Sequence, residues 1–391
     1  ISYEGKLPEA KKAPWDGGFV FTKDSNGKDW VGVACEGFGA SSWWPCKDHL
    51  SDEPESMVIK VSAPKGLMAI ANGRLMKIDT GKLLNKFIWK VVSPINSYNV
   101  NISIGDYVHF SDTFISRIDA ARLDLDYWVL RDHLDKAKVQ FKQVKPMLEC
   151  YEEKLGKYPF YDDSYKLVET PYLGMEHQSC IAYGNGYKKG YAGNTRMTNG
   201  HEFDYIIIHE SGHEWFGNNI SCADIADMWI HEAFTTYTES IFVECKYGKE
   251  KAVDYINSKF ERIGNKAPMV GIYGVNEEGA GDMYAKGSLF LNTIRHLIDQ
   301  DSLWWSILYD MNTVAFHHKT IGYSDVLAYF NQRTGMDFTK LFEQYLRYPS
   351  PPKLKYSLKK VKGKTFEVSM QWETDVKGFE MPIAVLTKKG V

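Results

Sequence analysis

The chain has 391 residues, which at about 150 residues per domain predicts two or three domains and a core large enough to fold without disulfide bonds. Lys and Arg total 47 against 50 Asp and Glu, so the formal net charge of −3 lacks the basic excess of a nucleic-acid-binding protein. With 25% charged and 44% hydrophobic residues, the chain is too apolar for wholesale disorder.

No run of about 18 apolar residues occurs, so the sequence predicts no transmembrane helix. The first residues, Ile-Ser-Tyr-Glu, do not resemble a signal peptide, and the chain begins with Ile instead of Met. We therefore expect a processed product or a fragment. Localisation and oligomeric state stay open at this point.

Residues 1–118 are predicted to form an N-terminal antiparallel β-sheet domain. Short runs rich in β-branched and aromatic residues alternate with turn pairs such as Asn26-Gly27 and Asn72-Gly73. The predicted strands cover residues 19–21, 30–34, 57–61, 68–71, 86–92 and 99–104.

Residues 119–348 are predicted to form a mostly helical domain with a small sheet. Apolar residues recur at helical spacing over 131–155, with a kink expected at Pro146 and a stop at Gly156. Strands are expected at 165–168 and 175–183, followed by a Gly-rich loop at 184–200. Further helices are expected at about 202–216, 225–247, 249–263, 286–298, 303–311, 324–333 and 338–345.

Residues 349–391 are predicted to begin a C-terminal β domain. Pro349, Pro351 and Pro352 punctuate the chain as a linker would, and residues 354–386 alternate like strands. The stretch is short for a domain, so we expect it to be incomplete.

The six cysteines form no Cys-x-x-Cys pair, which indicates neither a disulfide framework nor a cysteine zinc site. We expect Cys35, Cys46, Cys150, Cys180, Cys222 and Cys245 to be mostly buried free thiols.

The most informative segment is His209-Glu210-Ser211-Gly212-His213. Two histidines at positions i and i+4 lie one turn apart on one helix face, so both imidazoles can reach one ion. Glu210, next to the first histidine, is placed to touch another ligand of that ion.

Zinc hydrolase sites use three protein ligands and one open position, so a third ligand should follow. Eighteen residues separate His213 from Glu232, which lies in an apolar helical segment where a solvated side chain is less expected. Glu239 is seven residues further, two turns along the same face, where it could hydrogen-bond a ligating histidine or simply be solvated.

The spacing His-Glu-x-x-His, 18 residues, Glu resembles the gluzincin metallopeptidases and, more narrowly, the aminopeptidase N and leukotriene hydrolase family. Leu-Gly-Met-Glu-His, ending at His177, is similar to the family's Gly-x-Met-Glu-Asn, and Tyr284-Ala-Lys-Gly to its Tyr-x-Lys-Gly. The segment 41–48, Ser-Ser-Trp-Trp-Pro-Cys-Lys-Asp, resembles the family's Arg-x-x-x-Pro-Cys-x-Asp. The resemblance runs from about residue 14 to 348.

Four positions depart from the family pattern. Leu173 stands for Gly, His177 for Asn, Ser41 for Arg, and His231 for the Asn that often precedes the third ligand. The family's C-terminal helical domain, with an arginine for the peptide carboxylate, has no counterpart in this sequence. The family's N-terminal sheet domain usually begins before the equivalent of Ile1, so we expect the chain to be truncated at both ends, including the start of its sheet domain. That truncation bears on exopeptidase stringency rather than on the metal chemistry.

The resemblance implies an α+β multidomain fold: a saddle-like N-terminal antiparallel sheet, a thermolysin-like mostly helical catalytic domain, and the start of a C-terminal β domain. It implies one Zn²⁺ per chain, held by His209, His213 and Glu232. It also implies a zinc-dependent aminopeptidase, with Glu210 as general base toward a zinc-activated water and Tyr284 as the donor to the oxyanion. Members of this type are often exported, so an exported or periplasmic location is a further expectation.

An aminopeptidase must recognise a free α-ammonium group beside the scissile bond. The resemblance places Glu176, and secondly Glu36, around that group. Gly174 suits a position where substrate backbone approaches closely, and the strand with Met175 could add backbone hydrogen bonds to an extended peptide. The expected partners are therefore peptides with a free N-terminus, and no nucleic acid.

Three alternatives remain. The same zinc site could serve a thermolysin-type endopeptidase, which would cleave N-acetylated peptides as fast as free ones. The leukotriene branch implies an epoxide hydrolase activity, for which no residue here argues. A non-catalytic binding scaffold would be expected to lose ligands or the base, and none is lost here.

Overall fold

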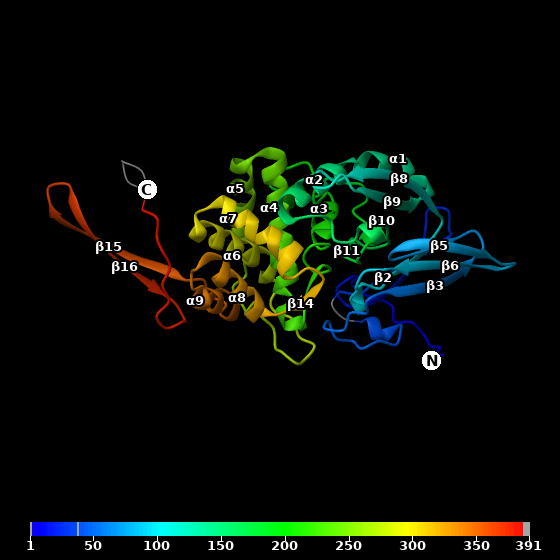
Figure 1. The fold of residues 1–391 in the computed structure, drawn as a ribbon, viewed down its shortest axis with the longest axis horizontal. Coiled ribbons are helices and arrows are strands. Elements are labelled where there is room, and N and C mark those ends of the chain that lie inside the picture. Colours follow the sequence, from blue (N-terminus) through cyan, green and yellow to red (C-terminus); the bar gives the residue numbers. More distant parts are fainter. Residues whose placement is uncertain (1, 37–38, 386–391) are drawn as a thin grey trace.

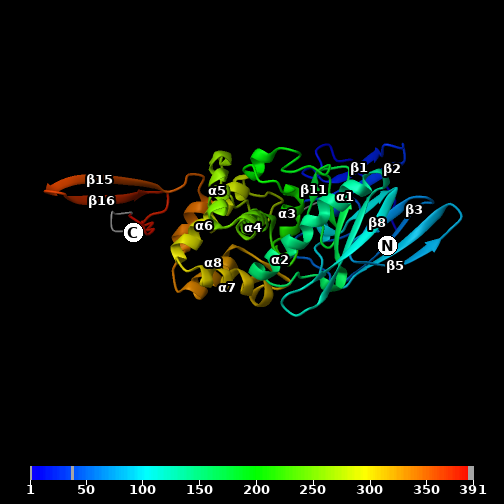
Figure 2. The same cartoon turned by 90° about the horizontal axis from the view of Figure 1, so that it is seen from above.

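The computed structural model describes residues 2–36 and 39–385. The N-terminal sheets lie at one end, helices form the centre, and a two-stranded hairpin projects at the other end (Figure 1, Figure 2). This is the α+β arrangement that the sequence predicts. Within the described ranges, no helix is long and apolar enough to cross a membrane.

Two antiparallel sheets form the N-terminal end. One has the order β1-β2-β7-β4, from β1 (Gly18–Lys23), β2 (Asp29–Ala34), β7 (Ile102–Gly105) and β4 (Met68–Ala71). The other has the order β3-β6-β5, from β3 (Met57–Pro64), β6 (Leu84–Val91) and β5 (Arg74–Thr80). The sequence did not predict β5, whose side chains are largely exposed and carry no clear apolar face.

A third sheet, with parallel and antiparallel strand pairs, packs against the helical region. Its order is β11-β12-β10-β9-β8, from β11 (Gly174–Met175), β12 (Ile181–Tyr183), β10 (Tyr165–Glu169), β9 (Arg122–Leu130) and β8 (Tyr107–Ile115). The strand expected at 175–183 is thus two short antiparallel strands joined by a turn. Because β11 ends the sheet, one edge of the Gly174-Met175 backbone has no neighbouring strand among the described residues.

The single kinked helix expected at 131–155 is wrong. Two helices, α1 (Leu134–Gln140) and α2 (Val144–Leu155), are separated by a 3₁₀ turn at Phe141–Gln143. Pro146 lies in the first turn of α2, where backbone N–H groups have no helical partner and a proline therefore costs little. The stop at Gly156 is confirmed by its positive φ of 95°.

One helix, α4 (Trp229–Tyr247), runs through the centre of the helical region. Its side chains from Trp229 to Val243 are all buried. Around it lie α3 (Tyr205–Gly212), α5 (Lys249–Asn257) with a 3₁₀ turn at Ser258–Arg262, α6 (Asp282–Ile298), α7 (Asp301–Asp310), α8 (Tyr323–Thr334) and α9 (Thr339–Arg347). The strands β13 (Ile220–Cys222) and β14 (Lys319–Ile321) form a parallel pair, and β13 contacts α4. The apolar core extends from the mixed sheet through α2, α3, α4 and α6.

A disulfide bond joins Cys150 of α2 to Cys245 of α4, which the sequence did not predict. The two residues are 95 positions apart, and packing of α2 on α4 brings their Cα atoms to 6.0 Å. Cys35, Cys180 and Cys222 are free and buried, as expected, and Cys46 is free and half-buried.

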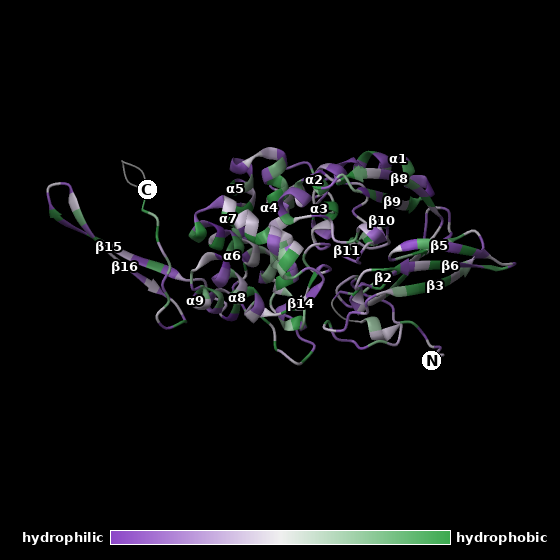
Figure 3. Cartoon of the chain, viewed as in Figure 1, coloured by the Kyte–Doolittle hydropathy of each residue, from purple (hydrophilic) through white to green (hydrophobic). Residues whose placement is uncertain are grey.

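The hairpin of β15 (Lys353–Lys362) and β16 (Thr365–Glu373) follows the predicted proline linker. Hydrophilic and hydrophobic residues alternate along it (Figure 3). Residues 374–385 add no further strand to the stretch predicted at 354–386, and Leu386 lies outside the described residues. The domain boundaries at 118 and 348 stay predictions.

Candidate metal centre and substrate cleft

The start of α3 is fixed by the buried carboxylate of Asp204. Its Oδ1 accepts hydrogen bonds from the backbone N–H groups of Ile206 and Ile207, at 3.1 and 3.4 Å. Three side chains also donate to this carboxylate, namely Gln140, Tyr183 and Asn185. The N-cap therefore holds the helix that carries the histidines.

His209, His213 and Glu232 come together as the sequence predicts. Nε2 of His209 and Nε2 of His213 lie 3.5 and 3.6 Å from Oε2 of Glu232, which stands in the first turn of α4. A tetrahedral zinc ion with ligand bonds of about 2.0–2.1 Å separates its ligand atoms by about 3.4 Å. The two measured distances fit that geometry.

Both histidines are held so that Nε2 faces the common point. Nδ1 of His213 lies 3.0 Å from the backbone carbonyl of Phe216, to which it can donate. Nδ1 of His209 lies 2.7 Å from Oε1 of Glu239. Such partners fix the tautomer and orientation of a metal-binding imidazole.

Glu239 is fully buried and is itself held by two donors. Lys259 Nζ lies 2.6 Å and Tyr255 OH 2.5 Å from its Oε2. Burial favours the neutral acid, but the charge of Lys259 and the contact with His209 prevail and lower the pKa of Glu239 well below its usual range. Glu239 therefore supports His209 as a carboxylate, the role that the sequence left open.

The donor set fits a zinc ion. Oε2 of Glu232 is buried and has no hydrogen-bond partner among the described residues, although the two imidazole nitrogens stand nearby. A buried carboxylate oxygen without a partner is costly unless a cation binds it. Two imidazoles and one carboxylate, with room for a further ligand, are the donors of catalytic zinc sites.

Glu210 lies beside this ligand set and next to Gly174 of β11. A Cβ atom at Gly174 would stand 3.0 Å from Oε1 of Glu210 and 2.7 Å from Ile206, so only glycine fits there. Burial raises the pKa of Glu210 to about 7. A carboxylate of that basicity can take up and return a proton near neutral pH.

Two more carboxylates, the buried Glu176 and the half-buried Glu36, stand next to the ligands. Glu176 accepts a hydrogen bond of 3.0 Å from Tyr98 OH, and Glu36 one of 3.3 Å from Tyr284 OH. Burial and then repulsion from Glu232 raise the pKa of Glu36 to about 8. Burial and then repulsion from Glu36 raise the pKa of Glu176. A cation placed between these carboxylates would relieve that repulsion.

Tyr284 lies in the first turn of α6 and its ring stacks on His209, with ring centroids 6.2 Å apart. Because its hydroxyl donates a hydrogen bond to Glu36, the Tyr284 side chain contacts both a metal-ligand histidine and one of the two additional carboxylates.

A cavity of about 360 Å³ joins these groups. Its walls include every predicted site residue except Glu239, which lies behind His209. Sequence reasoning missed Trp15, Tyr191, Met197, Tyr205, Thr236, Lys259 and Arg262 on the walls, and Tyr255 behind them. The sequence holds one signal for these residues: Tyr255 and Lys259 are four positions apart in a predicted helix, so both side chains can reach the same partner.

The family departures lie mostly outside the cavity. Nε2 of His231 accepts the backbone N–H of Cys222 at 2.8 Å, and His177 is buried with Nε2 3.3 Å from the carbonyl of Val33. Ser41 donates to Asp48 on the surface. Only Leu173 lines the cavity.

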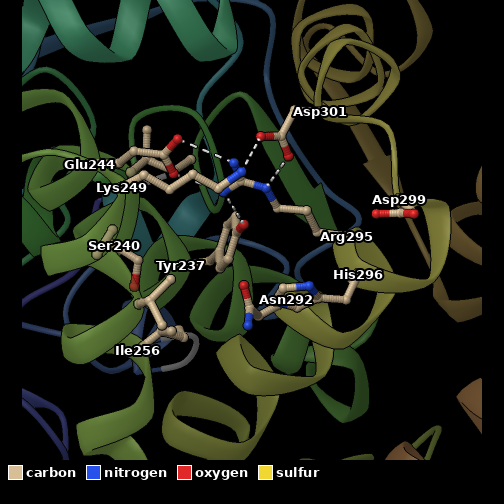
Figure 4. A pocket seen from close by; sticks show the side chains of 13 residues that line it. Tyr237, Ser240, Glu244, Lys249, Ile256, Asn292, Arg295, His296, Asp299 and Asp301 are labelled. Carbon is tan, nitrogen blue, oxygen red and sulfur yellow. Dashed lines mark hydrogen bonds and ion pairs between the residues drawn. The ribbon is translucent and has the colours of Figure 1, made fainter. Parts of the chain in front are cut away.

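A second cavity, of about 310 Å³, lies between α4, α5 and α6 (Figure 4). No predicted site residue lines it. Its central charge, Arg295, donates to Glu244 at 2.8 and 3.2 Å and to Asp301 at 2.9 Å, and Lys249 also pairs with Asp301. This network ties helices together and leaves its guanidinium satisfied.

The chain is similar in sequence to known peptidases. The model of the peptidase family M1 domain matches residues 139–345, just over half of the chain. Human aminopeptidase B is 26% identical over 56% of this chain and 33% of its own length. Aminopeptidase N of Lactobacillus helveticus is 23% identical over 83% of this chain and 39% of its own length. The chain thus spans about a third of the length of these relatives.

Solved structures share the fold. A mutant M1 zinc metallopeptidase from Deinococcus radiodurans, bound to a Tyr-Ser-Ala substrate, superposes with a TM-score of 0.69. It is 18% identical, and the match covers 83% of this chain and 71% of that one.

Proposed function

Because the chain belongs to peptidase family M1, we propose that it is a zinc-dependent aminopeptidase that hydrolyses the first bond of peptides with a free N-terminus. The main support is the pair of carboxylates, the buried Glu176 and the half-buried Glu36, beside the three metal-ligand side chains. Within the described part of the chain, neither carboxylate has a basic partner within ion-pair distance.

His209, His213 and Glu232 would hold the zinc ion. When bound, zinc supplies Lewis-acid chemistry that polarises the scissile carbonyl and lowers the pKa of water. The protein's own contribution is the fixed orientation of both imidazoles by Glu239 and Phe216.

Glu210 is the proposed general base. Its carboxylate takes a proton from the attacking water and returns it to the leaving amine. The raised pKa of about 7, caused by burial, suits both transfers. A bound cation would lower that pKa and favour the base form at the start of the reaction.

Tyr284 is the proposed oxyanion donor. Its hydroxyl donates a hydrogen bond to the carbonyl oxygen as negative charge develops there, leaving the contact with Glu36.

Glu176 and Glu36 would bind the α-ammonium group, which places the first peptide bond, and no later one, beside Glu210. The edge of β11 at Gly174-Met175 that pairs with no strand of residues 2–36 and 39–385 is available to an extended peptide backbone. The peptide substrate of the Deinococcus radiodurans relative supports this substrate class.

The proposal is tested with matched peptides that have free or acetylated N-termini, assayed with and without a chelator. We expect cleavage of the free peptide only, lost with chelator and restored by zinc. Equal rates on both peptides would instead show an endopeptidase, and chelator-insensitive cleavage would remove the metal from the mechanism.

A further inference from the structure

The three-stranded sheet β3-β6-β5 concentrates positive charge. From Met57, where β3 starts, to Val91, where β6 ends, seven Lys and Arg residues stand against Asp79 alone. This segment therefore carries a net charge of +6 in a chain whose total is −3. The sheet lies at the end of the molecule that is far from α4 and α6 in both views (Figure 1, Figure 2), and none of its residues lines the catalytic cavity.

The strand register places four lysines on one face of this sheet. Lys60 of β3 and Lys77 of β5 both lie opposite Ile88 of β6, and Lys86 and Lys90 share that face because they stand two residues to either side. All four lysines are exposed. The alternate residues of β3 and β6 point into the apolar core at this end of the chain. The face turned to solvent is therefore the basic one.

Most of these charges have no acidic partner. Arg74 pairs with Asp124 at 2.8 Å, and Lys77 pairs with Asp79 at 2.6 Å. Within residues 2–36 and 39–385, no carboxylate lies within ion-pair distance of Lys60, Lys65, Lys82, Lys86 and Lys90. A surface that serves solubility alone intersperses charges of both signs. Five unpaired ammonium groups in one sheet instead complement an anionic partner.

Apolar side chains are exposed on the same strands. Val58 and Met76 are 52% and 60% exposed, and Leu83 in the turn between β5 and β6 is 82% exposed. The backbone N–H of Lys65 donates to the carbonyl oxygen of Leu83 at 2.9 Å, so the turn after β3 lies beside this leucine. A soluble polyanion gains nothing from exposed leucine, whereas a bilayer takes up apolar side chains while lysine ammonium groups stay at the headgroups.

Unpaired lysines and an exposed leucine together fit a lipid surface. We propose that the β3-β6-β5 sheet binds the surface of anionic phospholipid bilayers. Lys60, Lys86 and Lys90 face the lipid phosphates, and Leu83 reaches the boundary of the acyl chains. The inference goes beyond the proposed aminopeptidase function and does not depend on it, because the sheet and the catalytic cavity share no residue.

The test measures co-sedimentation of the chain with unilamellar vesicles. Vesicles of phosphatidylcholine with about 30 mol% phosphatidylglycerol are compared with vesicles of phosphatidylcholine alone, in about 0.1 M salt. We expect binding to the anionic vesicles only. Raising the salt to about 0.5 M should release most of the bound chain, because salt screens the attraction between lysines and lipid phosphates.

Two variants separate the contributions of charge and apolar surface. Each lysine at an anionic surface contributes about fivefold to the partition coefficient, so Lys60→Gln/Lys86→Gln/Lys90→Gln should lower it by about 100-fold. Leu83→Ser should lower it by about tenfold, because the hydroxyl removes the apolar side chain that enters the bilayer. All four positions are exposed, so the midpoint of urea unfolding should stay at the wild-type value.

Lys359→Gln/Lys360→Gln/Lys362→Gln in the hairpin of β15 and β16 is the matched control. It removes the same number of exposed positive charges from another exposed pair of strands at the far end of the molecule (Figure 1). It should leave the partition coefficient within about twofold of wild type.

Each other outcome overturns the proposal. If the wild-type chain does not bind anionic vesicles, or binds both kinds of vesicle alike, the sheet does not recognise anionic lipid. If the hairpin control lowers the partition coefficient as much as the sheet variant does, total charge and not this face is responsible. If the chain binds heparin as tightly as vesicles and Leu83→Ser loses no binding, the partner is a soluble polyanion and not a bilayer.

Discussion

Replacing Glu239 by glutamine separates two roles of one buried carboxylate. Oε1 of Glu239 orients His209 at 2.7 Å, and Oε2 holds the buried ammonium of Lys259 at 2.6 Å. The amide keeps the size and removes the charge. We therefore expect both a weaker metal site and a less stable fold.

The magnitudes follow from these contacts. Loss of a carboxylate behind a metal-bound histidine lowers metal affinity by about 10–100-fold. Breaking a buried ion pair costs about 3–5 kcal/mol, and we expect the lower end because the amide oxygen can still accept one hydrogen bond.

Zinc affinity is measured by competition with a chromophoric chelator, and stability of the metal-free chain by urea unfolding. The double variant Glu239→Gln/Lys259→Met removes the stranded ammonium group. It should regain most of the lost stability and none of the zinc affinity. A zinc Kd within about twofold of wild type in Glu239→Gln would refute the orienting role.

Three further predictions concern the same cleft. Glu210→Gln should lower kcat by about 10²–10⁴-fold with unchanged zinc content, as shown by metal analysis beside steady-state kinetics. Tyr284→Phe should lower kcat by about 100-fold or more with little change in KM; an equal loss in 1/KM would show substrate binding instead of oxyanion stabilisation. Burial raises the pKa of Asp204 to about 6, above its unfolded value, so its contribution to stability is present at low pH and is lost as pH rises through 6. The stability advantage of wild type over Asp204→Asn in urea unfolding should therefore be larger at pH 5 than at pH 7.5, and a constant difference would contradict it.

The metal ligands could be predicted because their geometry is local. The i, i+4 spacing of His209 and His213 and the position of Glu232 early in the next buried helix need only helix periodicity. The support behind them is not local. Lys259 and Tyr255 reach Glu239 only through the packing of α5 and its 3₁₀ turn against α4.

The sequence did not predict the strands β8 and β9, and they show why the sheet region is harder to predict than the metal ligands. β9 contains Asp124 and Asp126, which lower strand propensity when read alone. In the fold, Arg74 from another sheet pairs with Asp124 at 2.8 Å, and His109 across the ladder lies 2.8 Å from Asp126. These partners are distant in sequence, so the compensation is visible only in three dimensions.

The acidic cleft connects metal binding to substrate choice. Burial raises the pKa values of Glu36, Glu176 and Glu210, and repulsion from neighbouring carboxylates raises those of Glu36 and Glu176 further, which means that the cavity holds its carboxylates at a cost. A metal ion among the ligands and an ammonium group between Glu36 and Glu176 each lower that cost. Since both cations interact with the same carboxylates, each one already bound reduces the gain from the other. Under the proposed function, binding of the peptide's amine end is therefore coupled to binding of the metal.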